Sequence, residues 1–322
     1  MQPLFRLSSP LVALACVLAA SSAQASCGSS FCTLLNDRFA LGLSDHVGWS
    51  ADVRLESVTQ DRLRKGTSTI SPSEVTDEDA IERHTRNLNL VTTLERSFDP
   101  HWSVALRVPV VRRDHLHDLL DEETGSVGAS EQWKFTRVGD VQALGRYQDV
   151  SETQDFGWAV IGGLKLATGS RSVVNGDGVR AERALQPGSG TTDLVLGASL
   201  RRTLGATDAL NLQATVTQAL DSREDFKPGR RTELSAGWSH AMSQQWSTVL
   251  QLNLSHKGRD SGAQAEPENS GSTTVSVSPG VSVVTAAHDT AYAFVQLPVY
   301  QKVNGIQLVP RASFAVGWTH SF

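Results

Sequence analysis

The last nine residues of the chain alternate between large and small side chains. The large set is Phe314, Val316, Trp318, His320 and Phe322, and the residues between them are alanine, glycine, threonine and serine. Successive side chains of a β-strand point to opposite faces, so this segment predicts a strand with one mostly apolar face and one polar face. Such a strand needs an apolar environment on one side only, and this requirement narrows the possible folds more than any other feature.

This ending resembles the C-terminal signal of bacterial outer-membrane β-barrels, in which phenylalanine is the usual last residue. The resemblance implies that Phe314, Val316, Trp318 and Phe322 form a signal read by the barrel-assembly machinery. It also implies that Phe322 is the last outward residue of the strand that closes the barrel.

The N-terminus has the pattern of a cleaved signal peptide. Arg6 provides the positive charge, residues 11–20 form an apolar run, and Ala23-Gln-Ala25 is a small-x-small cleavage site. The run is shorter than the about 20 residues that a transmembrane helix needs. We therefore expect a signal peptide at 1–25, a periplasmic or plug segment at 26–45, and a barrel at 46–322.

The composition alone resembles that of a water-soluble protein, with 39% hydrophobic residues and a mean hydropathy of -0.21. A transmembrane barrel is compatible with these values, because only one face of each strand meets lipid and the other stays polar. The net charge of -5 gives no reason to expect a nucleic-acid partner.

Segments of period-two alternation recur along the whole mature chain. About twelve are found, near 49–56, 87–95, 102–110, 140–147, 156–166, 193–200, 210–217, 233–239, 246–255, 274–283, 292–300 and 307–322. An even strand number is typical of single-chain bacterial barrels. The pattern predicts an all-β fold, an antiparallel transmembrane β-barrel of about 12 strands, in the outer membrane of a Gram-negative bacterium.

The connections alternate between tight and long ones, as in such barrels, where periplasmic turns are short and extracellular loops are long. Tight turns are expected near 99–101, 151–155, 205–209, 243–245 and 287–290, and long polar loops near 62–82, 114–138, 169–190, 221–230 and 257–271. A soluble β-sandwich would also alternate. It would not explain Trp102 and Trp246 beside tight turns, which suit an interfacial aromatic girdle.

Prolines interrupt three of the expected strands. Pro109, Pro279 and Pro298 lack the N–H that a strand ladder uses, so we expect a bulge or a break at each.

Several charged side chains fall on the polar faces of the expected strands. The candidate lumen path consists of Arg54, Arg107, Arg146 and Lys165, with the aromatic residues Tyr292, Phe294 and Tyr300. The charges either form a network that stiffens the barrel or line a path for a solute. Twelve strands lie between the about 8 that side chains fill and the about 16 that leave an aqueous channel, so both hypotheses stay open.

The three aromatic residues are an exception to this polar face. In one register they form an inward stripe that contacts an apolar or aromatic solute. In the alternative, a register slip at Pro298 turns them toward lipid or the girdle.

A cysteine pair and a histidine pair are the candidates for a disulfide and a metal site. Cys27 and Cys32 precede the first strand, where export permits a local disulfide, and a metal site there lacks further ligands. His115 and His117 share one strand face, a weak metal signal, and we expect them to be exposed loop histidines. No metal or cofactor is predicted.

Motifs of common enzymes are missing from the sequence. It has no G-x-S-x-G, H-E-x-x-H, P-loop or C-x-x-C segment. An outer-membrane phospholipase is the enzymatic alternative, but its His-x-Ser-Asn-Gly segment is missing, and Asn304-Gly305 reads as a hairpin turn. We predict that the chain is not an enzyme.

Several stretches together resemble the outer-membrane barrel family named for the meta pathway of phenol degradation. They are residues 26–32 (SCGSSFC), 137–140 (RVGD), 163–169 (GLKLATG), 185–193 (LQPGSGTTD) and 296–305 (QLPVYQKVNG). The resemblance implies a transporter-like barrel that helps hydrophobic or aromatic compounds across the outer membrane.

The resulting hypothesis is passive passage of a small, plausibly aromatic solute. The alternative is a structural or surface-interaction barrel with a closed lumen. The expected partners are outer-membrane lipid and lipopolysaccharide, the assembly machinery, and a small solute that the sequence does not identify.

Overall fold

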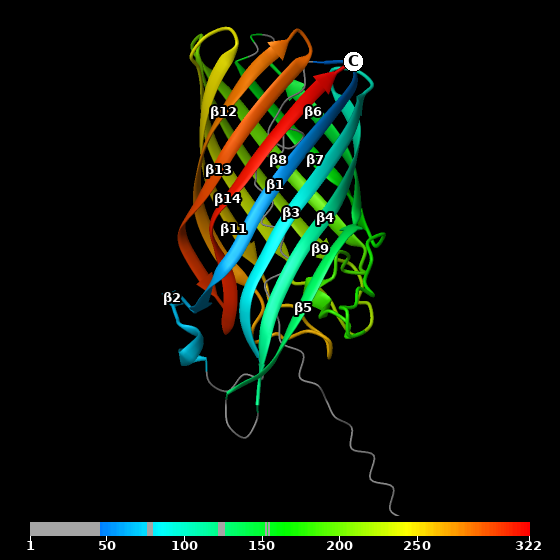
Figure 1. The fold of residues 1–322 in the computed structure, drawn as a ribbon. Coiled ribbons are helices and arrows are strands. Elements are labelled where there is room, and N and C mark those ends of the chain that lie inside the picture. Colours follow the sequence, from blue (N-terminus) through cyan, green and yellow to red (C-terminus); the bar gives the residue numbers. More distant parts are fainter. Residues whose placement is uncertain (1–45, 76–79, 122–125, 152, 154) are drawn as a thin grey trace, which may run out of the picture.

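The first and last wall strands pair with each other, and this pairing closes the sheet into a barrel (Figure 1). The computed structural model describes residues 46–75, 80–121, 126–151, 153 and 155–322. β1 (Gly48–Lys65) is antiparallel to β14 (Ile306–Ser321) along nearly its full length. The backbone N–H of Phe322 donates a hydrogen bond to the carbonyl oxygen of Trp49 at 2.8 Å. The C-terminus is therefore part of the closure.

Ten further strands complete the wall, each antiparallel to its neighbours. They are β3 (Ala80–Ser97), β4 (Trp102–Leu120), β6 (Val141–Val150), β7 (Phe156–Leu166), β8 (Asp193–Leu204), β9 (Asp208–Ala219), β10 (Arg231–Ala241), β11 (Trp246–Lys257), β12 (Ser272–Ala286) and β13 (Asp289–Val303). The prediction of a closed antiparallel barrel of about twelve strands is confirmed.

Four further elements lie beside the wall strands or in the loops between them. β2 (Ser68–Thr69) pairs with β1, and β5 (Val127–Val138) pairs with β4. Two 3-10 turns, η2 (Pro72–Glu74) and η3 (Arg183–Leu185), belong to long loops.

Short and long connections gather at opposite ends of the barrel. The C-terminus lies at one end, with the tight turns, and the long loops lie at the other (Figure 1). In the first turn, the Asp99 carboxylate accepts hydrogen bonds from the backbone N–H groups of His101 and Trp102, both at 2.8 Å. We call the two ends the tight-turn end and the long-loop end.

The strand faces divide as the alternation predicts. Leucines such as Leu196, Leu212 and Leu252 are exposed on the outer surface, whereas Gln213 and Asn253 are buried inside. Exposed aromatic side chains collect near the tight-turn end: Trp49, Phe98, Trp102, Phe156, Trp246, Trp318 and Phe322. The outer surface therefore has an apolar belt with an aromatic rim at that end.

The prediction of a loop at 114–138 was wrong. β4 continues to Leu120, and β5 pairs with it from Val110↔Val138 to Leu120↔Val127. In β5 the buried side chains are Trp133 and Phe135, whereas Lys134 and Thr136 are exposed. This strand has its apolar face inside and its polar face outside, so its pattern does not match a lipid-facing strand.

The expected loop at 62–82 is also shorter than predicted, because β1 runs to Lys65 and β3 begins at Ala80. Leu63, Val75, Ile81 and Leu308 form a buried apolar cluster there.

Irregular pairing accompanies each of the three prolines, although their strands are continuous. Pro109 lies where β4 changes partner from β6 to β5, and its carbonyl oxygen accepts the N–H of Gly139 at 2.9 Å. Pro298 adjoins a register shift in β13. At Pro279 the pairing with β11 continues through Leu250↔Pro279, whereas the pairing with β13 passes from Val277↔Leu297 to Gly280↔Phe294 and is interrupted between them.

Within the described residues, no helix is long and apolar enough to cross a membrane. The expected signal peptide at 1–25, the segment 26–45, and Cys27 and Cys32 lie outside the described residues.

Candidate functional site in the barrel lumen

Ion pairs occupy the inner face near the middle of the wall. On β1, Arg54 Nε lies 2.8 Å from Glu56 Oε1, and both side chains are buried. Arg146 on β6 pairs with Glu95 on β3 in the same way. Two-residue spacing on a strand places Arg54 and Glu56 on one face, where each offsets the cost of burying the other's charge.

Charges on different parts of the wall also interact. Arg107 on β4 donates a hydrogen bond to Gln142 Oε1 at 3.1 Å, and it attracts the carboxylate of Glu233 on β10. Glu233 also lies near enough to Glu56 for the two carboxylates to repel each other. The middle of the lumen therefore carries charges of both signs, contributed by strands on different sides of the barrel.

Two aromatic side chains lie on the inner face beside these charges. Tyr292 and Phe294 on β13 are buried, with ring centroids 6.0 Å apart. The Tyr292 hydroxyl donates to the carboxylate of Asp52, 3.0 Å from each oxygen. Thr319 Oγ1 donates to Asp52 Oδ2 at 2.7 Å. These contacts tie β13 and β14 to β1 next to the seam.

Tyr300 does not join the aromatic pair. A β-bulge shifts the register, with Val275↔Tyr300 followed by Ser276↔Pro298. The side chain of Tyr300 is 44% exposed, whereas Gln301 after it is buried. The inward position expected for Tyr300 was wrong, because the extra residue of the bulge reverses the alternation beyond Pro298.

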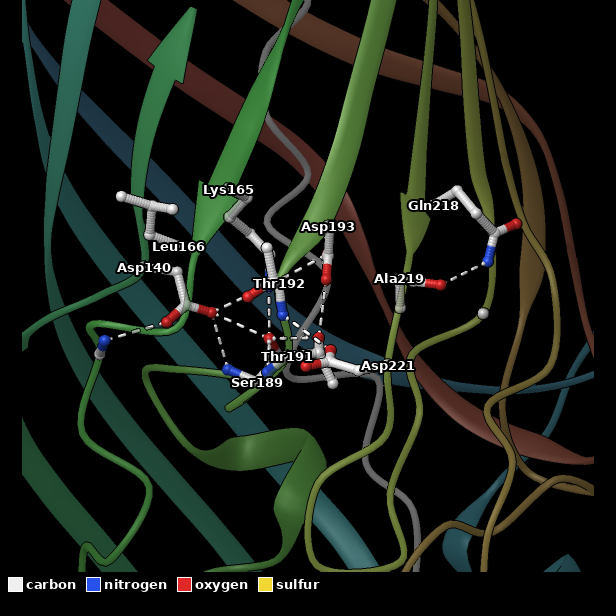
Figure 2. A network of polar contacts seen from close by, with 12 residues as sticks. Asp140, Lys165, Leu166, Ser189, Thr191, Thr192, Asp193, Gln218, Ala219 and Asp221 are labelled. Carbon is white, nitrogen blue, oxygen red and sulfur yellow. Dashed lines mark hydrogen bonds and ion pairs between the residues drawn. The ribbon is translucent and has the colours of Figure 1, made fainter.

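A buried network joins the wall to the loop 167–192 at the long-loop end. Lys165 Nζ lies between two carboxylates, 2.9 Å from Asp140 Oδ2 and 3.0 Å from Asp193 Oδ2 (Figure 2). Ser189, from the loop, donates its backbone N–H and its hydroxyl to Asp140, both at 2.9 Å. Asp140 also accepts the N–H of Gly169 at 2.9 Å. Both ends of the loop are thus held at one carboxylate.

Close backbone contact brings the two ends of this loop together. A Cβ atom on Gly188 would overlap the backbone of Gly169, and one on Gly169 would overlap that of Gly139 and Gly188. The Gly-rich stretches 163–169 and 185–193 therefore meet in space.

The two histidines of β4 lie inside, not in an exposed loop, so that expectation was wrong. The His115 side chain is fully buried, and its Nδ1 lies 2.8 Å from Thr85 Oγ1. His117 Nε2 lies 3.1 Å from Glu131 Oε2, and both imidazoles pack near Trp133. Trp133 in turn donates to the carbonyl oxygen of Val179 in the loop 167–192, at 3.0 Å. In the described part of the chain, no three His, Cys, Asp or Glu residues are arranged to hold a metal ion.

Sequence reasoning missed two groups at this end. Trp133 lay in the segment expected to be a loop, although the alternation of Trp133 and Phe135 with polar neighbours was a usable signal. The arginines of the loop 167–192 meet Glu224 of the next long loop, and no spacing in the sequence indicates that contact.

A closed antiparallel barrel with an apolar outer belt and a charged inner face has the architecture of outer-membrane channels and porins. No protein-family model matches the sequence, and no curated protein matches it. The class is therefore defined by the fold.

Solved structures share this fold at low sequence identity. The chain is similar to an outer membrane channel from Pseudomonas putida F1, with a TM-score of 0.62 and 12% identity over 89% of this chain and 100% of that chain. The KdgM porin has a TM-score of 0.43, at 11% identity over 85% and 99% of the two chains. The CymD monoaromatic hydrocarbon channel has a TM-score of 0.42, at 10% identity over 86% and 89%. The first similarity shows the barrel fold of this chain.

Proposed function

We propose that the protein is a passive channel of the outer membrane for a small solute of aromatic or hydrophobic character. The observation that carries the proposal is the division of the wall: leucines and aromatic residues outside, and Arg54, Arg107 and Arg146 with their acidic partners inside. A polar inner face is needed for a water-filled path and has no use in a barrel packed with apolar side chains.

Membership of the barrel family named for the meta pathway of phenol degradation belongs to this proposal. It is supported by the resemblance of residues 163–169, 185–193 and 296–305, two of which meet at the Asp140 network. The fold shared with the Pseudomonas putida channel is consistent with it. In the proposed channel, the tight-turn end faces the periplasm, and the long-loop end faces outward and contacts lipopolysaccharide.

Conductance and solute uptake test the proposal. The full-length protein is reconstituted into planar bilayers and liposomes, with benzenesulfonate as an aromatic probe that does not cross lipid by itself. We expect single-channel conductance and uptake of the probe. Absence of both would overturn the channel and leave the structural or surface-interaction barrel with a closed lumen.

That alternative has one observation in its favour, namely the ion pair of Arg54 with Glu56 in a buried position. Paired charges stiffen a wall as well as they line a path. The same reconstitution therefore decides between the two functions.

The aromatic part of the proposal has its own test. Phe294 is the member of the pair Tyr292 and Phe294 that has no hydroxyl, and Tyr300 is an outward aromatic residue on the same strand. We expect Phe294→Ala to change the uptake of benzenesulfonate, and Tyr300→Ala to leave it unchanged. Equal uptake by wild type and Phe294→Ala would show that the aromatic pair is not part of the path.

A direct assay tests the phospholipase alternative. The detergent-solubilised protein with Ca²⁺ is expected to release no fatty acid from phospholipid, and release above that of a heat-denatured sample would contradict this.

A further inference from the structure

Three arginines surround a single carboxylate at the long-loop end of the barrel. Glu224, in the loop between β9 and β10, lies 2.8 Å from Arg180 Nη2, 3.6 Å from Arg171 Nη1 and 3.6 Å from Arg183 Nη1. All three arginines belong to the loop 167–192. One negative charge therefore faces three positive charges.

The side chain of a fourth arginine, Arg223, passes close to this group. The side chains of Arg171, Arg183 and Arg223 converge at Gly190, which has a φ of 76°. A Cβ atom at this position would lie 3.1 Å from Arg183 Nη2 and 3.2 Å from both Arg171 Cδ and Arg223 Cγ. The missing side chain leaves room for the three arginines to gather.

Arg183 is buried without full use of its donors. Its side chain is 4% exposed, its Nη2 donates to the carbonyl oxygen of Ser189 at 2.8 Å, and its guanidinium lies 5.4 Å from the ring centroid of Phe226. Its Nε and Nη1 have no hydrogen-bond acceptor. Guanidinium donors in a buried position normally have acceptors, so this arginine is short of one anionic partner.

Glu224 is held by a strained turn. Backbone hydrogen bonds between Arg223 and Phe226 close a two-residue turn, and both central residues, Glu224 and Asp225, have positive φ values of 52° and 51°. Glycine and asparagine are the usual residues in such turns. A glutamate there costs backbone strain, and such strain tends to persist at functional sites.

We propose that Arg171, Arg180 and Arg183 form a binding site for the carboxylate group of a small solute, in which the side chain of Glu224 occupies the place of that carboxylate until the solute arrives. The Glu224 side chain is 40% exposed, so it can leave toward solvent. The incoming carboxylate supplies the acceptor that Arg183 lacks. Planar guanidinium groups bind carboxylates with paired hydrogen bonds, which suits arginine rather than lysine at each of the three positions.

The electrostatics of the two loops agree with this exchange. Burial, with repulsion from Arg180 and Arg171, lowers the pKa of Arg183, and attraction by Glu224 and by Asp140 of the wall opposes that change. A hydrogen bond from Arg180, with attraction by the three arginines, lowers the pKa of Glu224. The Asp225 carboxylate, next in the turn, is the other acidic group of the loop tip.

Binding is tested on the full-length protein in an uncharged detergent at pH 7.5, by calorimetry. The probe is benzoate, with benzamide as its uncharged counterpart and inorganic phosphate as the alternative anion. We expect benzoate to bind, and added salt to weaken its binding. Benzamide should bind at least about tenfold more weakly, because it carries no negative charge and offers one acceptor oxygen in place of two.

Variants assign the binding to these residues. Arg183→Gln and Arg180→Gln are each expected to weaken benzoate binding about tenfold. Arg180 is the second position because its side chain is 47% exposed, so its replacement should not disturb folding. Glu224→Gln should strengthen it several-fold, because the internal carboxylate no longer competes. Arg202→Gln, at the tight-turn end, is the matched control and should bind as wild type does.

Equal binding of benzoate and benzamide, no binding of benzoate, or unchanged binding by Arg180→Gln would overturn the proposal. Binding of phosphate without benzoate would overturn it as well, since the site would then serve phosphate groups. The binding site is independent of the proposed channel function. Benzoate binding without conductance would support the site and contradict the channel.

Discussion

Two glycines on the inner face determine where the lumen aromatics lie. A Cβ atom on Gly280 would overlap the ring of Phe294, and one on Gly317 would overlap the ring of Tyr292. Each ring covers a glycine of a neighbouring strand, an arrangement in which an aromatic residue compensates for the missing side chain. The aromatic pair is therefore part of the wall as well as of the lumen surface.

Gly280→Ala tests this packing. The added methyl group displaces the Phe294 ring, and we expect a loss of about 1–3 kcal/mol in the free energy of unfolding, as for other overpacked positions. The measurement is urea-induced unfolding in lipid vesicles. Gly162→Ala on β7 is the control, because the nearest atom to its Cβ is 4.0 Å away. Equal stability of the two variants would contradict the account.

At Glu224, a pH dependence is expected. Hydrogen bonding from Arg180 holds the pKa of Glu224 below its ordinary value of 4.5. A depressed pKa means that the folded loops favour the ionised form of Glu224. The contribution of this carboxylate to the stability of the loops is therefore complete above about pH 4.5 and is lost as the pH falls through the pKa of the folded state. Limited proteolysis between pH 6 and pH 3, with an acid protease, should show the loops 167–192 and 220–230 opening at the acid end. Glu224→Gln should remove this dependence.

At the scale of elements, the loop 167–192 is fixed by the wall strands that flank it. Lys165 ends β7, Asp193 begins β8, and Asp140 precedes β6. The lysine lies between two buried carboxylates, and Ser189 ties the loop to it.

Lys165→Met should release the loop. Removal of the cation leaves Asp140 and Asp193 buried with like charges, a change that typically costs about 3–5 kcal/mol. Hydrogen exchange of residues 167–192 should rise well above that of the wild type. Lys134→Met is the control, since that side chain is 63% exposed. Unchanged exchange in Lys165→Met would mean that the loop is held by its other contacts.

The terminal strand gives a second prediction at this scale. Phe322 is 68% exposed, and its N–H bonds to Trp49 across the seam. Deletion of Phe322 should lower the yield of assembled, protease-resistant barrel in membranes more than it lowers conductance per assembled barrel. Phe322→Trp should assemble normally. Normal assembly after the deletion would contradict the role of this residue as part of an assembly signal.

For the whole molecule, the outer belt makes a quantitative prediction. Leu212 is 51% exposed near the middle of β9, and Gln213 beside it faces inward. Leu212→Arg should destabilise the barrel in lipid by about 2–4 kcal/mol, as expected for a charge at mid-membrane depth. Gln213→Arg should cost less, because the lumen is polar. The two variants are compared by urea unfolding in vesicles, and a larger loss for Gln213→Arg would reverse the assignment of inside and outside.

Much of the lumen face was predictable because alternation is a local property. The polar faces of β1, β4, β6 and β7 place Arg54, Arg107, Arg146 and Lys165 inside by period two alone. Their role in a solute path stays a prediction, as does the role of Cys27 and Cys32. Tyr300 follows the alternative hypothesis, in which a register slip at Pro298 turns it outward, while Tyr292 and Phe294 stay inside. Alternation by itself could not decide between the two registers, because a single bulge residue reverses it.

Alternating strands, tight and long connections in turn, and an aromatic end were enough to predict a closed barrel whose outer surface is apolar. These features follow from which neighbouring residues share a strand face. How the charges are used depends on long-range contacts, because Arg180 and Glu224 are 44 residues apart and Asp140 and Ser189 are 49 apart. Such pairs form when the closed wall brings separate loops to one end of the barrel, and no local pattern encodes that distance.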